Sequence, residues 1–246
     1  MSQTAIITGS TSGIGKASAK LFSENGWHVV LVARNEAKLN ALASELPGNS
    51  DIFVCDLSSE TDVSDLCSQL QSKSFSHPLK ALINNAGIIE RKEANDHSLE
   101  DWTQQFQVNL FAPAMITNAC FQHLKASSPS TVVNVSSSIG VRPIPQCAAY
   151  SASKAAMNSW TQTLALEWAQ YGITVNALCP GIVNTPIHNF DQISNAKELE
   201  QSMDAAHPLG RMGRPQELAE NIMFLCGTAS QWKTGSIEII DGGISL

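Results

Sequence analysis

Three glycines lie in the stretch Thr8-Gly9-Ser10-Thr11-Ser12-Gly13-Ile14-Gly15, between an apolar run at 5–8 and a helical pattern at 16–25. Glycine lets the backbone turn tightly, and the free N–H groups that begin the following helix favour an anion such as a pyrophosphate. The spacing G-x-x-x-G-x-G differs from the common G-x-G-x-x-G, and a purely structural turn is the alternative. Because the turn directly follows the first apolar run, the stretch predicts a dinucleotide-binding fold with Gly9 to Gly15 around the pyrophosphate.

Short apolar runs alternate with longer amphipathic stretches along the chain. The runs are continuously apolar, which is typical of parallel strands covered on both faces. The alternation predicts an α/β fold: one Rossmann-type domain over 1–246, with a doubly wound sheet of about seven mainly parallel strands and helices on both faces. The expected strands are 5–8, 29–33, 52–55, 81–84, 131–136, 174–179 and 237–240. The expected helices are 13–25, 36–45, 60–72, 99–125, 150–170 and 215–228.

One interval, 185–212, is too long for an ordinary loop and contains a short helical pattern at 195–206. Such segments are commonly lids, so we expect a substrate-binding lid here. With 88–94 and 140–147, this lid would enclose a pocket for a medium-sized, partly hydrophobic carbonyl or alcohol. The expected wall residues are Val141, Ile144, Pro145, Ile187, Phe190, Ile193, Met203 and Met212, with His188 and His207 as polar guides or ordinary surface residues.

The composition limits the classes of partner. The 246 residues are 43% hydrophobic and 15% charged, and their net charge of -7 argues against a nucleic-acid surface, which needs a basic face. No apolar run reaches the roughly 18 residues of a membrane span, and no secretory signal is visible. The six cysteines lack the CxxC spacing of metal or redox motifs. We therefore expect a cytoplasmic protein with reduced thiols, no metal and no membrane partner.

At the position expected to contact the adenosine ribose, the chain has a basic residue instead of an acidic one. Dinucleotide sites usually carry Asp or Glu about 20 residues beyond the glycines. Arg34 occupies that place here, with Glu36 close by. A guanidinium suits a 2′-phosphate, so Arg34 predicts NADP(H) in preference to NAD(H), with a solvated residue after a strand as the alternative.

Tyr150 and Lys154 place a phenol and an ammonium four residues apart in a helical pattern. That spacing puts both side chains on one helix face, and a cation beside a phenol favours the phenolate. The unperturbed pKa of tyrosine is about 10, so such a pair suits proton transfer near neutrality, although a solvated helix face is the alternative. Ser137 ends a strand at the ligand-binding edge of the sheet, where Ser136 and Ser138 are equally plausible by chemistry alone.

Six motifs in one order resemble the classical short-chain dehydrogenase/reductase family over essentially the whole chain. They are Thr8-Gly9-(x3)-Gly13-Ile14-Gly15, Asn84-Asn85-Ala86-Gly87, Asn109, Ser137, Tyr150 with Lys154, and Pro180-Gly181-Ile182-Val183-Asn184-Thr185. Each motif is modestly specific, whereas the full set in sequence is highly specific. The resemblance implies an NADP(H)-dependent oxidoreductase that transfers a hydride between nicotinamide C4 and a carbonyl or secondary alcohol.

The resemblance also implies a role for each matching residue. Tyr150 is expected to be the acid/base, and Lys154 to lower its pKa and to hydrogen-bond the nicotinamide ribose. Ser137, selected by the family's interval from serine to tyrosine, orients the substrate oxygen, and Asn109 holds a water in a proton relay. The remaining matches are cofactor contacts: Asp56 and Leu57 beside the adenine, Asn85, Ala86 and Gly87 along the cofactor, and Val183 and Thr185 at the nicotinamide carboxamide.

The chain is also similar to the 3-oxoacyl-(acyl carrier protein) reductases of this family. However, Gln170 and Tyr171 stand before Gly172, where related reductases often carry a basic residue for the acidic carrier. A free ketone, sugar or steroid-like alcohol stays open as substrate, and a non-catalytic NADP-sensing protein is a further alternative. Family members usually form homotetramers through the two long helices, here 99–125 and 150–170, and the C-terminal strand; a dimer, or packing within one subunit, is the alternative.

Overall fold

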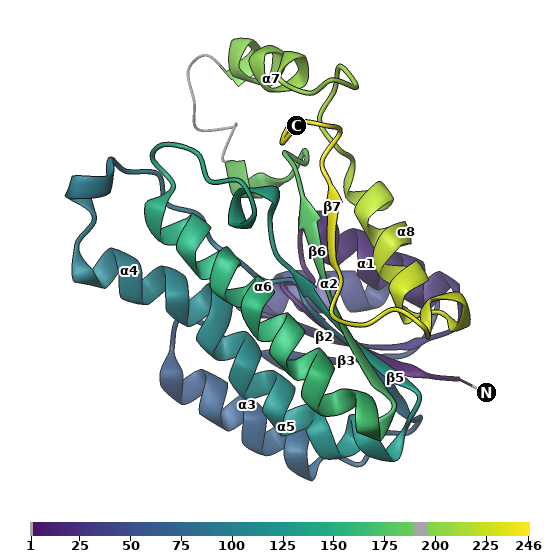
Figure 1. Ribbon diagram of the computed structural model, residues 1–246. Coiled ribbons are helices and arrows are strands. Elements are labelled where there is room, and N and C mark those ends of the chain that lie inside the picture. The colour runs from purple at the N-terminus through teal and green to yellow at the C-terminus, as the bar shows by residue number, and fades with distance from the viewer. Residues whose placement is uncertain (1, 189–195) are drawn as a thin grey trace.

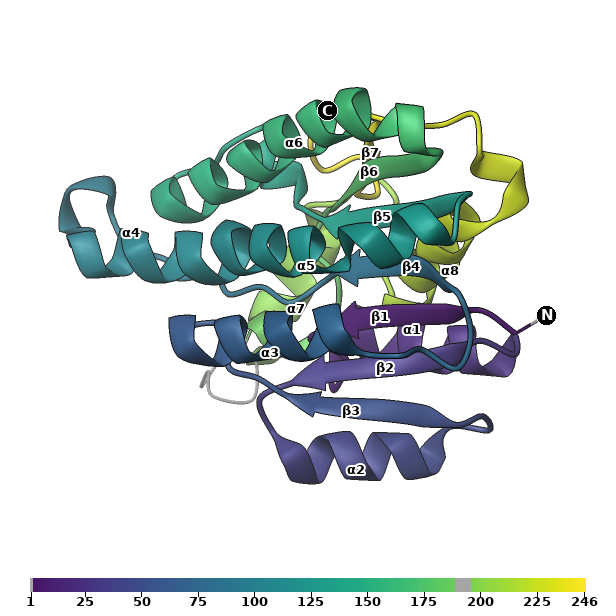
Figure 2. The same ribbon diagram turned by 90° about the horizontal axis from the view of Figure 1, so that it is seen from below.

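All described strands belong to one sheet. The computed structural model describes residues 2–188 and 196–246. Seven strands follow the order β3-β2-β1-β4-β5-β6-β7, and every neighbouring pair is parallel (Figure 2). They are β1 (Thr4–Thr8), β2 (His28–Ala33), β3 (Ser50–Val54), β4 (Leu79–Asn84), β5 (Ser130–Val135), β6 (Ile173–Pro180) and β7 (Ile237–Ile240). The predicted doubly wound sheet is confirmed, and each expected strand is present.

The strand order reverses next to β1, which makes that strand the centre of the fold. Every residue of β1 is buried, and β1 pairs with β2 on one side and with β4 on the other. The connections that follow β1 and β4 therefore diverge at the carboxyl edge of the sheet. Open α/β sheets bind ligands at such a point because the diverging loops leave a crevice there.

Helices cover both faces of the sheet, and each face has its own apolar core (Figure 1). On one face lie α3, α5 and α6, with Leu66 and Ile116 in the buried cluster. On the other lie α1, α2 and α8, with Phe22 and Ile222. The helices are α1 (Gly13–Glu24), α2 (Glu36–Glu45), α3 (Glu60–Ser72), α4 (Leu99–Phe106), α5 (Ala112–Ala126), α6 (Ala148–Trp168), α7 (Ala196–Ala205) and α8 (Pro215–Cys226).

Side-chain caps explain where three of these helices begin. Asn35 Oδ1 accepts a hydrogen bond from Lys38 N at the start of α2, and Ser59 plays the same role at α3. Ser98 opens α4 with a capping box. The caps satisfy backbone donors that have no partner in the first helical turn, so these residues fix the boundaries.

The helix expected over 99–125 is present without a break, but it is not α-helical throughout. Between the end of α4 and the start of α5, residues Gln107–Phe111 form a π-helical turn. A π turn inserts an extra residue into the helical repeat and is frequently found at functional sites. Asn109 lies within this turn, which the sequence periodicity did not predict.

The edges of the sheet are less covered than the sequence indicated. The continuous apolar pattern predicted strands that are buried on both faces, and this holds for the inner strands. In the edge strand β3, however, Val54 is 53% exposed, and in β7, Ile239 is 43% exposed. An edge strand lacks a neighbour on one side, so an apolar pattern alone does not reveal its exposure.

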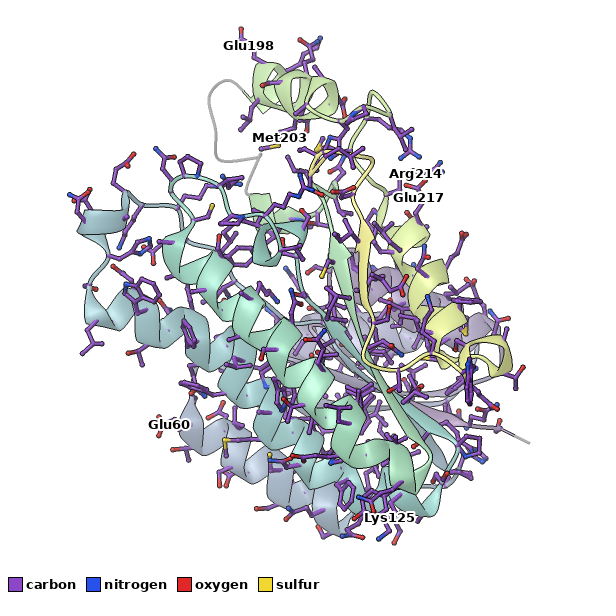
Figure 3. The ribbon with its side chains drawn as sticks, in the orientation of Figure 1. Glu60, Lys125, Glu198, Met203, Arg214 and Glu217 are labelled. Atoms are coloured by element: carbon purple, nitrogen blue, oxygen red, sulfur yellow. The ribbon has the colours of Figure 1, made fainter. Side chains whose placement is uncertain are left out.

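The short helix expected at 195–206 is present as α7. It lies beyond the carboxyl ends of β6 and β7 (Figure 1). Met203 lies on the side of α7 that faces the rest of the molecule, whereas Glu198 points away (Figure 3). Phe190 and Ile193 of the expected lid lie outside the described residues, and the lid at 185–212 stays a prediction.

Candidate active site

A cavity of about 1020 Å³ opens at the carboxyl edge of the sheet. Ligand pockets commonly measure ~300–1000 Å³, so this one has room for a dinucleotide and a small substrate. Most of the residues expected at the site line it: Gly9, Thr11, Ser12, Gly13, Ile14, Arg34, Asp56, Leu57, Asn85, Ala86, Gly87, Ser137, Tyr150, Lys154, Val183 and Thr185. Three expected residues, Ser10, Gly15 and Asn109, are not among the lining residues.

Ser10 and Gly15 belong to the glycine turn but support it from the side that faces away from the cavity. Ser10 N and Oγ lie 3.3 and 3.4 Å from Val32 O, so Ser10 is turned toward β2 and away from the cavity. A Cβ on Gly15 would lie 2.3 Å from Gly9 O, which explains why glycine is required there. Gly9 itself has a φ of +65°, and the turn leads into the N-terminus of α1, where unpaired N–H groups favour an anion.

Asn85 ties the end of β4 to the end of β1. Its Nδ2 donates to Thr8 O at 2.9 Å, and Thr8 Oγ1 accepts hydrogen bonds from the backbone N–H groups of Asn85 and Ala86. Asn84 has a different role: it is fully buried and donates to Asn134 Oδ1 at 2.8 Å, which links β4 to β5 inside the core. Of the two asparagines, only Asn85 therefore lines the cavity.

Two exposed cations lie at the end of the cavity where adenosine is expected. Arg34 directly follows β2, Lys38 lies in the first turn of α2, and both line the cavity. Asp56 and Leu57, which follow β3, line it as well. Sequence reasoning found Arg34 but missed Lys38. The available signal was that Lys38 is a second cation close in sequence to Arg34, in the first turn of the helix that follows β2.

Tyr150 and Ser137 reach the cavity from α6 and from the loop after β5. Tyr150 is 7% exposed, and burial raises its pKa to about 12, whereas a hydrogen bond with Ser137 and the charge of Arg91 act in the opposite direction. Ser137 Oγ accepts a hydrogen bond from Ile139 N at 3.3 Å, so its own proton can be donated to the Tyr150 oxygen or to a substrate oxygen. Both hydroxyl groups are therefore potential donors to a substrate oxygen.

Lys154 lies one helical turn after Tyr150 and is only 2% exposed. Its Nζ donates to Val135 O at 2.9 Å and lies 5.9 Å from the centroid of the Tyr150 ring. Burial lowers the pKa of this ammonium to about 8. Ser137 and Arg91 lower the pKa of Tyr150, while the Lys154 ammonium donates to the Val135 carbonyl. The expected effect of Lys154 on the phenol stays a prediction.

Asn109 is fully buried behind the cavity wall. Its Oδ1 accepts from Ile88 N at 2.9 Å, and its Nδ2 donates to Ile88 O and to Ser153 Oγ. The side chain therefore joins the π turn both to the loop after β4 and to α6. A Cβ on Gly87 would lie 3.2 Å from Asn109 Oδ1 and 3.5 Å from Lys154 Nζ, so glycine keeps these two groups close. The relay role of Asn109 stays a prediction.

Apolar and cationic side chains share the walls at 88–91 and 139–144. Ile144 and Ile187 line the cavity as expected. The side chain of His207 is buried, with Nδ1 2.7 Å from Met203 O, so it is packed inside the protein and does not guide a substrate. Expected wall residues that do not line the cavity are Val141, Pro145, Met203 and Met212. Lining residues that sequence reasoning did not single out include Arg91, Gln104, Ile139 and Arg142.

The described residues, 2–188 and 196–246, also set limits on other kinds of site. No helix within them is long and apolar enough to cross a membrane. The same ranges contain no group of three or more His, Cys, Asp or Glu residues that could hold a metal ion. All six cysteines are free, and five of them are buried.

A doubly wound parallel sheet with a glycine turn at its switch point defines a class of dinucleotide-binding proteins. Comparison with known proteins narrows this class. A family model described as enoyl-(acyl carrier protein) reductase matches residues 9–245. The protein FixR of Bradyrhizobium diazoefficiens is 37% identical over 98% of this chain and 86% of its own length. The 3-oxoacyl-[acyl-carrier-protein] reductase FabG of Rickettsia bellii is 33% identical over 99% and 97%.

A comparison with solved structures agrees with the sequence comparisons. A putative NAD(P) dependent gluconate 5-dehydrogenase from Beutenbergia cavernae, with bound NADP, superimposes with a TM-score of 0.89 at 30% identity, over 98% of this chain and 96% of that one. The chain belongs to the short-chain dehydrogenase/reductase family. It is therefore an oxidoreductase that acts on CH–OH or C=O groups with NAD(P), and the resemblance seen in the sequence is confirmed.

The raised pKa of Tyr150 gives a prediction for the protein in the absence of nucleotide. A phenol is neutral when protonated, so burial keeps Tyr150 protonated up to a higher pH than the usual value of about 10. The ultraviolet tyrosinate signal of the wild type minus that of Tyr150→Phe should stay near zero from pH 7 to about pH 10. An additional tyrosinate in the wild type with a midpoint well below that pH would contradict the assignment.

Proposed function

We propose that this protein reduces a carbonyl to a secondary alcohol with NADPH, and catalyses the reverse oxidation with NADP+, using Tyr150 as general acid/base. The proposal rests on one observation: the Ser137 hydroxyl, the Tyr150 phenol and the buried Lys154 ammonium meet at one wall of the cavity. When bound, the cofactor supplies or accepts the hydride. The chain itself must then orient the carbonyl oxygen and move one proton.

The residues along the cavity fit the parts of a dinucleotide. The glycine turn and the N-terminus of α1 would hold the pyrophosphate, and Asp56 and Leu57 would border the adenine. Further along, backbone groups of 85–87 would contact the cofactor, and Val183 and Thr185 would meet the nicotinamide carboxamide. Lys154 Nζ, next to Gly87, is in a position to serve the nicotinamide ribose.

The proton step follows from the two hydroxyl groups. During reduction, Tyr150 donates its proton to the substrate oxygen as negative charge develops there, and the Ser137 hydroxyl donates a hydrogen bond to the same oxygen. The positive charge of Lys154 stabilises the phenolate that remains, as does that of an oxidised nicotinamide ring nearby, and both oppose the burial that raises the pKa of Tyr150. During oxidation, the phenolate accepts the alcohol proton.

Tyr150→Phe should lower kcat by roughly 100- to 10,000-fold, because it removes the proton donor and leaves the apolar ring in place. NADPH binding, followed by fluorescence titration, should stay close to that of the wild type. The matched control is Tyr171→Phe, which removes the same hydroxyl from the chain's other tyrosine, at the far end of α6. Substantial turnover of a ketone panel by Tyr150→Phe would sink the proposed role.

We also propose a preference for NADP(H), which rests on Arg34 and Lys38 at the adenosine end of the cavity. A 2′-phosphate would offer these cations a charge-assisted contact that the ribose hydroxyl of NAD does not.

Arg34→Asp should therefore shift the ratio of kcat/KM for NADPH over NADH by ~10-fold or more toward NADH. Lys38→Gln is the graded control and should shift the same ratio less, because it removes one charge and adds no repulsion. An unchanged ratio in Arg34→Asp, measured by steady-state kinetics, would refute the preference.

The substrate is less closely defined than the type of reaction. Reduction of a 3-oxoacyl group on a carrier protein is the alternative that the similarity to FabG of Rickettsia bellii favours. Other relatives are named for different substrates, for example the NAD-dependent glycerol dehydrogenase of Listeria innocua. The site offers isoleucine side chains for a partly apolar molecule. Outside the cavity, Gln170 and Tyr171 stand where related reductases often carry a basic residue for an acidic carrier.

We further propose that the protein forms a homotetramer, with a dimer as the alternative. Large apolar side chains are exposed on the surfaces expected to associate: Phe111 and Met115 beside and on α5, Leu166 on α6, and Ile239 on the edge strand β7. Leu166 is 84% exposed, which is unusual for a leucine that only packs within one subunit. Light scattering should give about four times the mass of one chain, and a monomeric mass would contradict the proposal.

A further inference from the structure

The charges inside the cavity differ in sign from those of the whole protein. The chain carries a net charge of -7. In the part of the cavity wall that the structure describes, however, Asp56 is the single acidic side chain, against the cations Arg34, Lys38, Arg91, Arg142 and Lys154. The function proposed above uses Arg34, Lys38 and Lys154. Arg91 and Arg142 have no role in it.

These two arginines come from neighbouring segments near the catalytic side chains. The segment after β4 runs beside the segment before α6, where Lys92 pairs with Cys147 as in a parallel sheet and Lys92 N donates to Gln146 O at 3.0 Å. Arg91 lies on the first segment and Arg142 on the second, and both line the cavity. The two guanidinium groups are therefore carried by walls that are fixed to each other.

Arg91 is also close enough to act on the reacting groups. Its positive charge lowers the pKa of the Tyr150 phenol and that of the Cys147 thiol. Cys147 is fully buried next to the start of α6, so the Arg91 guanidinium is within electrostatic range of the first turn of the helix that carries Tyr150.

Among the described residues, no carboxylate side chain forms a salt bridge with either arginine. The acidic groups nearest in sequence are already occupied: Glu90 and Asp101 both bind Lys92 Nζ at 2.7 Å, and Glu93 accepts a hydrogen bond from Gln146 Nε2 at 2.8 Å. Within residues 2–188 and 196–246, neither Arg91 nor Arg142 makes a salt bridge. An exposed arginine on a convex surface needs no partner, but two of them that line one cavity offer paired N–H donors to a bound anion.

We propose that the substrate carries a carboxylate that binds Arg91, with Arg142 as a second contact, so that the protein acts on a small oxo acid and the corresponding hydroxy acid. The inference rests on the function proposed above and names its substrate class. Ile88, Ile139 and Ile144 line the cavity beside the arginines and suit the carbon chain between carboxylate and carbonyl. Hydride adds to the carbonyl carbon, Tyr150 gives its proton to the carbonyl oxygen, and the carboxylate is unchanged.

The proposal separates this substrate class from a carrier-bound one. A thioester has no free carboxylate, so an acyl group on a carrier has no anionic group next to its carbonyl for these arginines to bind. A free oxo acid satisfies at least Arg91 with two parallel N–H donors. Charge-assisted hydrogen bonds of this kind are worth ~1.5–3 kcal/mol each, which corresponds to a preference of ~10- to 100-fold over an uncharged analogue.

The test compares each acid with its own methyl ester, which keeps the carbonyl and removes the charge. The probes are pyruvate, acetoacetate and levulinate, in which the carbonyl lies progressively further from the carboxylate. For each pair, kcat/KM is measured with saturating NADPH. Binding of each acid and ester to the complex of the protein with NADP+ is measured by calorimetry, which requires no turnover.

The variants are Arg91→Gln, Arg91→Lys, Arg142→Gln and, as the control for net charge, Lys125→Gln. Lys125 lies near the end of α5, at the opposite end of the molecule from α7 (Figure 3). The wild type should prefer at least one acid over its ester by ~10-fold or more. Arg91→Gln should abolish that preference while the ester is still reduced, Arg91→Lys should keep part of it, Arg142→Gln should reduce it, and Lys125→Gln should leave it intact.

Two other results would overturn the inference in distinguishable ways. If the wild type reduces esters as well as acids and Arg91→Gln changes neither, the proposed reductase function stands and the carboxylate site is wrong. If no probe is reduced, the reductase proposal loses its support, and calorimetry then tests the carboxylate site by itself. Binding of an acid that depends on Arg91 supports the carboxylate site. Equal binding of acids and esters, or no binding of either, refutes the carboxylate site.

Discussion

The arrangement of the site depends on the buried hydrogen bond between Lys154 Nζ and Val135 O, which joins α6 to the end of β5. Burial of an ammonium is costly, and the lowered pKa of about 8 corresponds to roughly 3 kcal/mol against the charged form. The surrounding backbone is built around this side chain. A Cβ on Gly140 would lie 2.8 Å from Lys154 Cβ, and Ser136 Oγ donates to Lys154 O, so the loop after β5 packs tightly on the helix.

The hydrogen bond between Lys154 and Val135 also determines where the other side chains of the site lie. Because α6 is held against the end of β5, Tyr150 and Ser137 come together at the carboxyl edge of the sheet, beside the glycine turn. Asn109 closes the same region from behind by bonding to both Ile88 and Ser153. The phenol is thereby kept out of water and protonated, while the positive charges that can lower its pKa are Lys154, Arg91 and a bound oxidised nicotinamide. In the proposed mechanism, cofactor binding and acid/base chemistry are therefore coupled through the buried Lys154 amine.

The sequence predicted the elements better than it predicted what side chains do. Apolar runs identified all seven strands, since buried parallel strands have a continuous pattern that needs no knowledge of their neighbours. The helical pattern of the sequence did not reveal the π turn at Gln107–Phe111, because a π turn changes the helical repeat without changing the amino-acid composition. It also gave no warning that Ser10 turns toward Val32 instead of the cavity. Arg91 and Arg142 lie in the two ranges expected as pocket walls, 88–94 and 140–147. The sequence did not single them out, because their significance depends on contacts between distant segments and on which carboxylates are already paired.

The most direct test of the account is the pKa of Tyr150 in the complex with NADP+, obtained from the tyrosinate absorbance of the wild type minus that of Tyr150→Phe at saturating nucleotide. If the buried amine and the oxidised nicotinamide act together on the phenol, the midpoint should fall from about 12 by more than ~2 pH units, to below the usual value of about 10 for tyrosine. A midpoint that stays near 12 in the complex would contradict the claim that cofactor binding prepares Tyr150 for proton transfer.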